Sequence, residues 1–179
     1  ERNVNSAGDR YYYTFARSIY FRHSLINQGF DATELSIKDS DIPEDINILV
    51  IADMRSPLSE EEMTRLEHYI ERGGNLFILG EPHRQEAMNP LLARFGIELM
   101  PGTLVQRNQD YLPSVVTAKL TDNAAAQSPR YAQLKRWGAS IVMPDASPLH
   151  YSTDKGYTVK PIAMTLKENS WNELETTDF

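Results

Sequence analysis

Apolar and polar positions predict a strand, a helix and a second strand between Ile46 and Pro82. Residues 46–52 form an apolar run of the length typical of a strand that is buried on both faces. Helical spacing of apolar residues follows over 59–72, and residues 75–79 are apolar again. A helical crossover between two apolar strands is a βαβ unit, which implies parallel strands and a right-handed connection. We therefore expect an α/β fold.

The predicted helix 59–72 carries a signal at each end. Ser59 can cap free backbone N–H groups, and Glu62 stands at the reciprocal position of a capping box. Gly73 and Gly74 follow the last turn and end the helix, because glycine tolerates a positive φ. The expected buried stripe consists of Met63, Leu66, Tyr69 and Ile70.

Further elements are expected on both sides of this unit. Apolar spacing predicts an amphipathic helix from Tyr11 to Gln28, and residues 32–37 alternate as in a strand. Downstream, the pattern predicts a helix at 88–95, a helical turn at 130–135, and strands at 97–100, 103–106, 114–120, 140–143 and 157–166. We expect an α/β sheet domain over residues 1–106 and a β-rich extension over residues 107–179 that packs on the same domain.

Composition narrows the function. The 179 residues can bury one sizeable core, and the formal charge of -7 argues against binding of nucleic acid or of an anionic membrane. The chain has no cysteine, which excludes disulfides, thiolate zinc sites and a cysteine nucleophile. No run approaches the roughly 20 apolar residues of a membrane span. From its abrupt ends we expect the chain to be one soluble domain of a longer protein.

Charged side chains follow both predicted strands of the βαβ unit. In open α/β sheets, ligands bind beyond the carboxyl ends of the parallel strands. The candidate ligand-binding residues at these strand tips are therefore Asp53, Arg55, Glu81, His83 and Arg84. The alternative interpretation is that these residues only organise turns and form ion pairs with acidic groups at the rim.

The same loops carry no recognisable catalytic pattern. Glu81, His83 and Glu86 offer oxygen and imidazole donors, but their spacing matches no strong metal motif. No GxSxG elbow is present, and Gly73-Gly74 follows a helix, whereas a phosphate-binding loop precedes one. We expect no catalytic residue, no metal and no cofactor.

The N-terminal segment is rich in aromatic residues. Part of this set must face a core, and the surplus predicts a surface for protein contacts. The candidate interaction residues are Tyr11, Tyr12, Tyr13 and Tyr20.

The order of several short motifs resembles the soluble domain of the GldG-like family, which comprises auxiliary subunits of ABC-type transport systems first associated with gliding motility. Residues 1–106 carry most of the resemblance. The matching segments are Glu1-Arg2, Ser24-Leu25-Ile26-Asn27-Gln28-Gly29-Phe30, Pro57-Leu58-Ser59-Glu60-Glu61-Glu62, Gly73-Gly74, Asn89-Pro90-Leu91-Leu92, Phe95-Gly96-Ile97 and the later Ser170-Trp171.

This resemblance implies a doubly wound, mainly parallel sheet of the flavodoxin-like or class I glutamine amidotransferase-like kind, with the first strand missing from this chain. It also implies a periplasmic domain at the extracytoplasmic face of the inner membrane, held by flanking membrane segments outside this chain. The implied partners are the permease and ATPase subunits of the same system, and a homo-oligomer is an additional possibility. The amidotransferases use a cysteine, which this chain lacks.

Three functions are weighed. The first is a non-catalytic domain of a transporter auxiliary or permease protein, which acts through protein contacts or by holding a substrate. The second is a small-ligand module, with carbohydrate as one possible ligand, and the third is a metal-dependent hydrolase. Both alternatives would use the strand tips.

Overall fold

The computed structural model describes residues 14–52 and 54–175. The chain forms two compact units, Glu1–Ile42 and Pro43–Phe179, and each is described here by itself. The predicted division at residue 106 coincides with the end of a strand inside the second unit. That division stays a prediction.

In the first unit, the helix predicted from Tyr11 to Gln28 is wrong for the described residues. Residues 14–17 are helical, turns follow, and a short 3₁₀ helix, η1, spans Ile26–Gln28. The Asn27 side-chain amide donates to the carbonyl oxygens of Ser18, Ile19 and Phe21 at 3.2, 3.1 and 2.9 Å. A continuous helix would use those carbonyls for its own backbone hydrogen bonds, so the side chain competes with the helix.

The strand predicted over residues 32–37 is also wrong, because no strand forms there. The alternation of apolar residues supplies a face for a strand, but a strand also needs a hydrogen-bonded neighbour. None of the strand pairs in the described part of the chain includes these residues.

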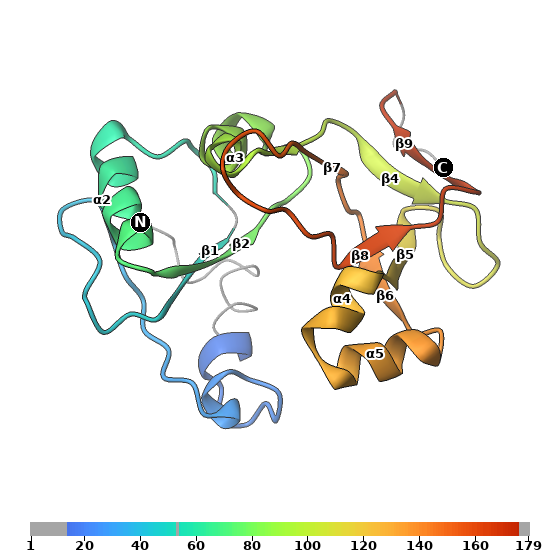
Figure 1. The fold of residues 1–179 in the computed structure, drawn as a ribbon, viewed down its shortest axis with the longest axis horizontal. Helices are drawn as coiled ribbons and strands as arrows, with labels where there is room; N and C mark the ends of the chain where they lie inside the picture. Colours follow the sequence, from blue (N-terminus) through green and yellow to red (C-terminus); the bar gives the residue numbers. More distant parts are fainter. Residues whose placement is uncertain (1–13, 53, 176–179) are drawn as a thin grey trace. The chain divides into compact units, whose positions relative to one another are not determined.

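The second unit contains the predicted βαβ unit (Figure 1). Strand β1 spans Ile48–Ala52, helix α2 spans Glu60–Glu71 and strand β2 spans Asn75–Leu79. The two strands pair in parallel, and this confirms the prediction. Their register runs from Ile48 opposite Asn75 to Ala52 opposite Leu79.

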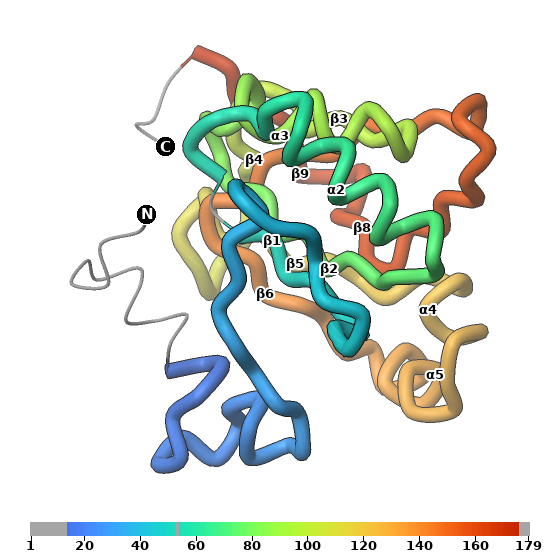
Figure 2. Tube along the Cα trace, turned by 90° about the vertical axis from the view of Figure 1, so that its left-hand side faces the viewer, coloured from blue at the N-terminus to red at the C-terminus, as the bar shows by residue number. Residues whose placement is uncertain are grey.

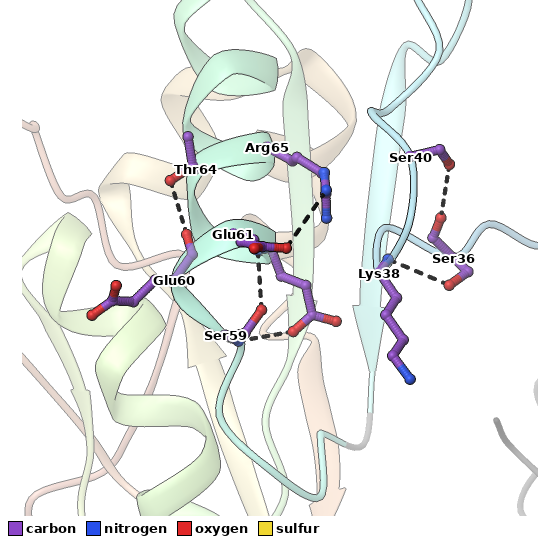
Figure 3. A network of polar contacts seen from close by, with 9 residues as sticks. Ser36, Lys38, Ser40, Ser59, Glu60, Glu61, Thr64 and Arg65 are labelled. Atoms are coloured by element: carbon purple, nitrogen blue, oxygen red, sulfur yellow. Dashed lines mark hydrogen bonds and ion pairs between the residues drawn. The ribbon is translucent and has the colours of Figure 1, made fainter.

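The predicted capping box of α2 is confirmed, and Figure 3 shows it at the start of the helix. The Ser59 N–H donates to Glu62 Oε2 at 2.8 Å, and the Glu62 N–H donates to Ser59 Oγ at 3.2 Å. One turn along, Glu61 and Arg65 form an ion pair at 3.9 Å. Both N-terminal N–H groups at the cap are thus bonded, which fixes where the helix begins.

The two glycines after α2 serve different purposes. Gly73 has a φ of +90°, as predicted for a helix stop. Gly74 has no positive φ, and a Cβ there would lie 2.4 Å from the Tyr69 ring. Glycine is therefore required at 74 for close packing, and the prediction of a positive φ at that position is wrong. Leu66 and Tyr69 of the predicted stripe are buried.

The expectation that residues 46–52 are buried on both faces is wrong. The exposed fractions of Ile48, Val50 and Phe77 are 49%, 47% and 50%. These three residues share one face of the β1–β2 pair, since Val50 is opposite Phe77 in the register and strand side chains alternate. The side chains on the opposite face of both strands, at positions 49, 51, 76 and 78, are partly covered. Ile48, Val50 and Phe77 are called the bare face below.

The predicted helix around 88–95 corresponds to α3 at Gln85–Leu92 and the 3₁₀ helix η2 at Ala93–Phe95. Strand β3, Ile97–Leu99, pairs antiparallel with β7, Leu149–Tyr151. The Asn89 side chain accepts from the Leu99 N–H at 2.8 Å and donates to the Leu99 carbonyl at 3.1 Å. This amide joins α3 to β3.

The remaining strands pair antiparallel. Figure 2 labels them along the trace of the chain. Strand β4, Thr103–Gln106, pairs with β9, Ser170–Glu173, and β5, Val115–Leu120, lies between β6, Ser140–Pro144, and β8, Ala163–Thr165. Helices α4, Asp122–Gln127, and α5, Pro129–Arg136, connect β5 to β6. The strand predicted at 157–166 is shorter than expected, because within that range only β8 is paired. A doubly wound, mainly parallel sheet stays a prediction.

Candidate functional site

The parallel register places both strand tips at one edge of the β1–β2 pair, because Ala52 and Leu79 lie opposite each other. Arg55, which follows β1, is exposed. Glu81 is half-buried after β2, and Arg84 occupies the position that precedes α3. His83 is exposed and has a φ of +62°. Asp53, the fifth candidate residue, lies outside the described residues.

The described strand tips offer the imidazole of His83, the carboxyl group of Glu81 and the guanidinium groups of Arg55 and Arg84. Within the described ranges, no group of three histidine, aspartate or glutamate residues is placed to hold a metal ion. The role of these five residues in ligand binding stays a prediction.

The aromatic candidates of the first unit are only partly described. Tyr11, Tyr12 and Tyr13 lie outside the described residues. Tyr20 is 94% exposed, so its ring has almost no cover in this structure. A role for Tyr20 in protein contacts also stays a prediction.

The bare face is a functional candidate that the sequence reasoning missed. Parallel sheets are normally covered on both faces, yet the β1–β2 pair leaves two aliphatic side chains and one phenylalanine about half exposed. Aromatic side chains such as that of Phe77 are enriched in protein interfaces, and the fully buried core of an interface is more apolar than its rim. The sequence contains one signal for this face, which is Asn75. This polar residue begins β2 opposite Ile48, so its side chain lies on the same face of the strand pair, and a polar side chain indicates contact with water.

A second concave surface lies between α2 and α3. It encloses about 220 Å³ and is lined by Met63, Leu66, Glu67, Ile70, Glu71, Leu91, Arg94, Phe95 and Tyr157. Arg94 and Glu67 form an ion pair at 2.6 Å, and the rings of Phe95 and Tyr157 meet edge to face at 5.2 Å. Its lining combines apolar side chains with the charged Glu67, Glu71 and Arg94, and it contains no serine or histidine to act as a nucleophile or base.

The carboxyl group of Asp154 has a lowered pKa. The Ser152 hydroxyl donates to Asp154 Oδ1, and this bond, with the Asp154 backbone and the Lys155 charge, lowers the pKa of Asp154 below its ordinary value of 3.8. Hydrogen bonding to the charged form favours that form. The Asp154 side chain is exposed, so this carboxyl group is not a buried reactive acid.

Helices long and apolar enough to cross a bilayer do not occur in the part of the chain that the structure describes.

Comparisons with known proteins identify the family. Searches of curated proteins and of solved structures each give no match. The family model described as ABC-type uncharacterized transport system matches residues 13–178, and this range contains both the βαβ unit and the antiparallel strands. The chain therefore belongs to this family of auxiliary components of ABC-type transport systems.

Proposed function

We propose that this chain is a non-catalytic, extracytoplasmic domain of an ABC-type transporter auxiliary or permease protein, and that it acts by contact with the permease subunit. Membership of the family makes other transporter subunits the natural partners. The GldG-like subgroup, with its flanking membrane segments, is part of this proposal.

The bare face carries the proposal. Ile48, Val50 and Phe77 present an apolar, uncharged surface on a parallel pair of strands. Water contact with such side chains costs roughly 25 cal/mol for each Å² of apolar surface, so a covering partner stabilises the assembly. A permease subunit is the occupant to which we commit, because the family places the chain within a transport system.

A non-catalytic role is supported by the chemistry of the chain. It has no cysteine for an amidotransferase-type nucleophile and no GxSxG elbow.

Charge placed on the bare face tests the proposed contact. The variants Val50→Asp and Phe77→Asp, in the complete transport system, should lose most of the permease that co-purifies with the parent. Leu112→Asp is the matched control, because Leu112 is an exposed apolar residue of a loop outside β1 and β2. Its co-purification should equal that of the parent. Unchanged co-purification by folded Val50→Asp and Phe77→Asp would overturn the proposed contact.

The extracytoplasmic location has its own test. Because the chain has no cysteine, Lys167→Cys creates a single thiol at an exposed position. A maleimide that cannot cross the inner membrane should label this thiol in cells with a permeable outer membrane. Labelling only after the inner membrane is disrupted would contradict the location and leave the contact test unaffected.

A further inference from the structure

Helix α5, which packs against α4 and contacts β5, has an exposed tryptophan at its C-terminal end (Figure 1). Trp137 is 71% exposed and directly follows the last residue of the helix. Its backbone N–H donates to the Gln133 carbonyl at 3.0 Å, so the helical turn continues to this residue. A tryptophan that is exposed on an ordered helix end is typical of a surface that meets another phase or another molecule.

Basic side chains lie on the same face of α5 as this tryptophan. Arg130, Gln133 and Trp137 follow one another at spacings of three and four, and Arg136 lies three residues after Gln133. All four side chains are exposed, and they are called the basic face below. No ion pair of Arg130 or Arg136 occurs within residues 14–52 and 54–175, so both guanidinium groups are available to an external anion.

The charge around the basic face is opposite to that of the whole chain. Residues 123–144 contain three basic residues and no acidic one, although the chain has a formal charge of -7. Among α4, α5, β5 and β6, the one acidic residue is Asp122, and Lys135 forms an ion pair with it. Lys119 Nζ donates to the Gly138 carbonyl at 2.9 Å and adds a further cation at the end of α5. Charges beyond about 10 Å are largely screened at 0.1 M salt, so this local charge favours an anionic partner.

The combination of tryptophan and arginine favours a lipid surface among the anionic partners. Trp side chains are enriched where a membrane meets water, and Arg side chains reach headgroups while their stems lie along apolar surface. Nucleic acid is recognised by longer rows of basic groups, which neutralise many phosphates. The chain belongs to a family of transport-system components, and transport takes place across a membrane. A bilayer is therefore within reach of such a component.

We propose that the basic face docks on the anionic surface of a lipid bilayer. The Trp137 indole lies at the level of the headgroups, and Arg130 and Arg136 contact lipid phosphates. The Lys119 ammonium adds to the attraction from the end of β5. This contact is separate from that of the bare face, because its partner is lipid and not the permease.

Vesicle co-sedimentation of the full chain tests the role of charge. At low ionic strength the chain should bind vesicles of phosphatidylglycerol and phosphatidylcholine in equal amounts, and it should not bind phosphatidylcholine alone. Arg130→Ala with Arg136→Ala should weaken binding by roughly 25-fold, since each basic residue near an anionic surface contributes roughly fivefold. Lys155→Ala with Lys167→Ala is the matched control, because it changes the net charge equally at exposed positions outside the basic face. Binding by this control should equal that of the parent, and equal weakening by both pairs would overturn the proposal.

Tryptophan fluorescence tests which part of the chain meets the lipid. The chain has two tryptophans, and Trp171 of β9 is the internal control. At saturating vesicles that contain brominated lipid, quenching of the parent should persist in Trp171→Phe and disappear in Trp137→Phe.

Two results would overturn the proposal. One is persistent quenching in a folded Trp137→Phe variant. The other is a parent that binds no anionic vesicles, which is also the result if the basic face binds an acidic protein or nucleic acid instead. The vesicles contain no permease, so neither result bears on the contact of the bare face.

Discussion

The Tyr69 ring lies directly against Gly74, three residues beyond the last residue of α2. A Cβ at position 74 would lie 2.4 Å from Cε1 and Cζ of that ring, far inside van der Waals contact. The Tyr69 hydroxyl also donates to the Asn75 carbonyl at 3.0 Å. The pair thus ties the end of α2 to the start of β2, so the ring cannot move aside without breaking a bond.

Gly74→Ala should therefore lower the free energy of unfolding by about 2 kcal/mol, because the added methyl group forces the Tyr69 ring to shift. Chemical denaturation measures this change. In a Tyr69→Leu background the cost of Gly74→Ala should shrink, since the ring is absent. Equal costs in both backgrounds would show that the ring is not the cause.

Ser59→Ala should lower the free energy of unfolding by about 1 kcal/mol, because the first turn of α2 loses its side-chain cap. Thermal or urea unfolding measures the difference. Ser56→Ala is the control, since Ser56 lies in the exposed loop before the helix and takes no part in the capping box. A loss at Ser56 as large as that at Ser59 would argue against the cap.

The βαβ unit was predictable because its signals are local. Apolar runs, a capping box and a glycine stop determine β1, α2 and β2 without information from the rest of the chain. The N-terminal helix was not predictable in the same way. The spacing of its apolar residues is typical of a helix. The Asn27 side chain, however, donates to backbone carbonyls up to nine residues away, and the spacing of apolar residues does not predict such hydrogen bonds.

Asn27→Ala should loosen the turns of the first unit, because three carbonyls lose a side-chain donor. Hydrogen exchange should speed up across residues 18–30, while β5 is unaffected. Gln28→Ala removes a single bond, from Gln28 Nε2 to the Arg22 carbonyl at 2.9 Å, so its effect should be smaller. Unchanged exchange in Asn27→Ala would contradict the account of this unit.

Ser152→Ala should raise the pKa of Asp154 toward 3.8, because the hydroxyl that favours the carboxylate is removed. A depressed folded-state pKa gives a stabilisation that is present above the unfolded pKa and is lost as the pH falls through the folded pKa. Carboxyl ¹³C NMR over this acidic range measures the titration. Thr153→Ala is the neighbouring control, and a parent Asp154 that titrates at 3.8 would refute the bond.

The functional candidates also divide into those that local sequence signals predict and those that only the structure reveals. Sequence reasoning found the charged strand tips because carboxyl ends of parallel strands are recognisable from the order of elements. It missed the bare face, because an apolar run predicts that a strand is buried but does not identify the element that would cover each of its faces. Only the register that aligns Val50 with Phe77, together with their exposure, reveals that this side lacks cover.

The central claim is that the bare face contacts the permease subunit of the transport system. A photo-crosslinking amino acid in place of Phe77, in membranes that contain the whole system, tests this contact most directly. The claim predicts a crosslink to the permease from position 77 and none from position 112 on the exposed loop. No permease crosslink from position 77, or crosslinking confined to the chain itself, would contradict it.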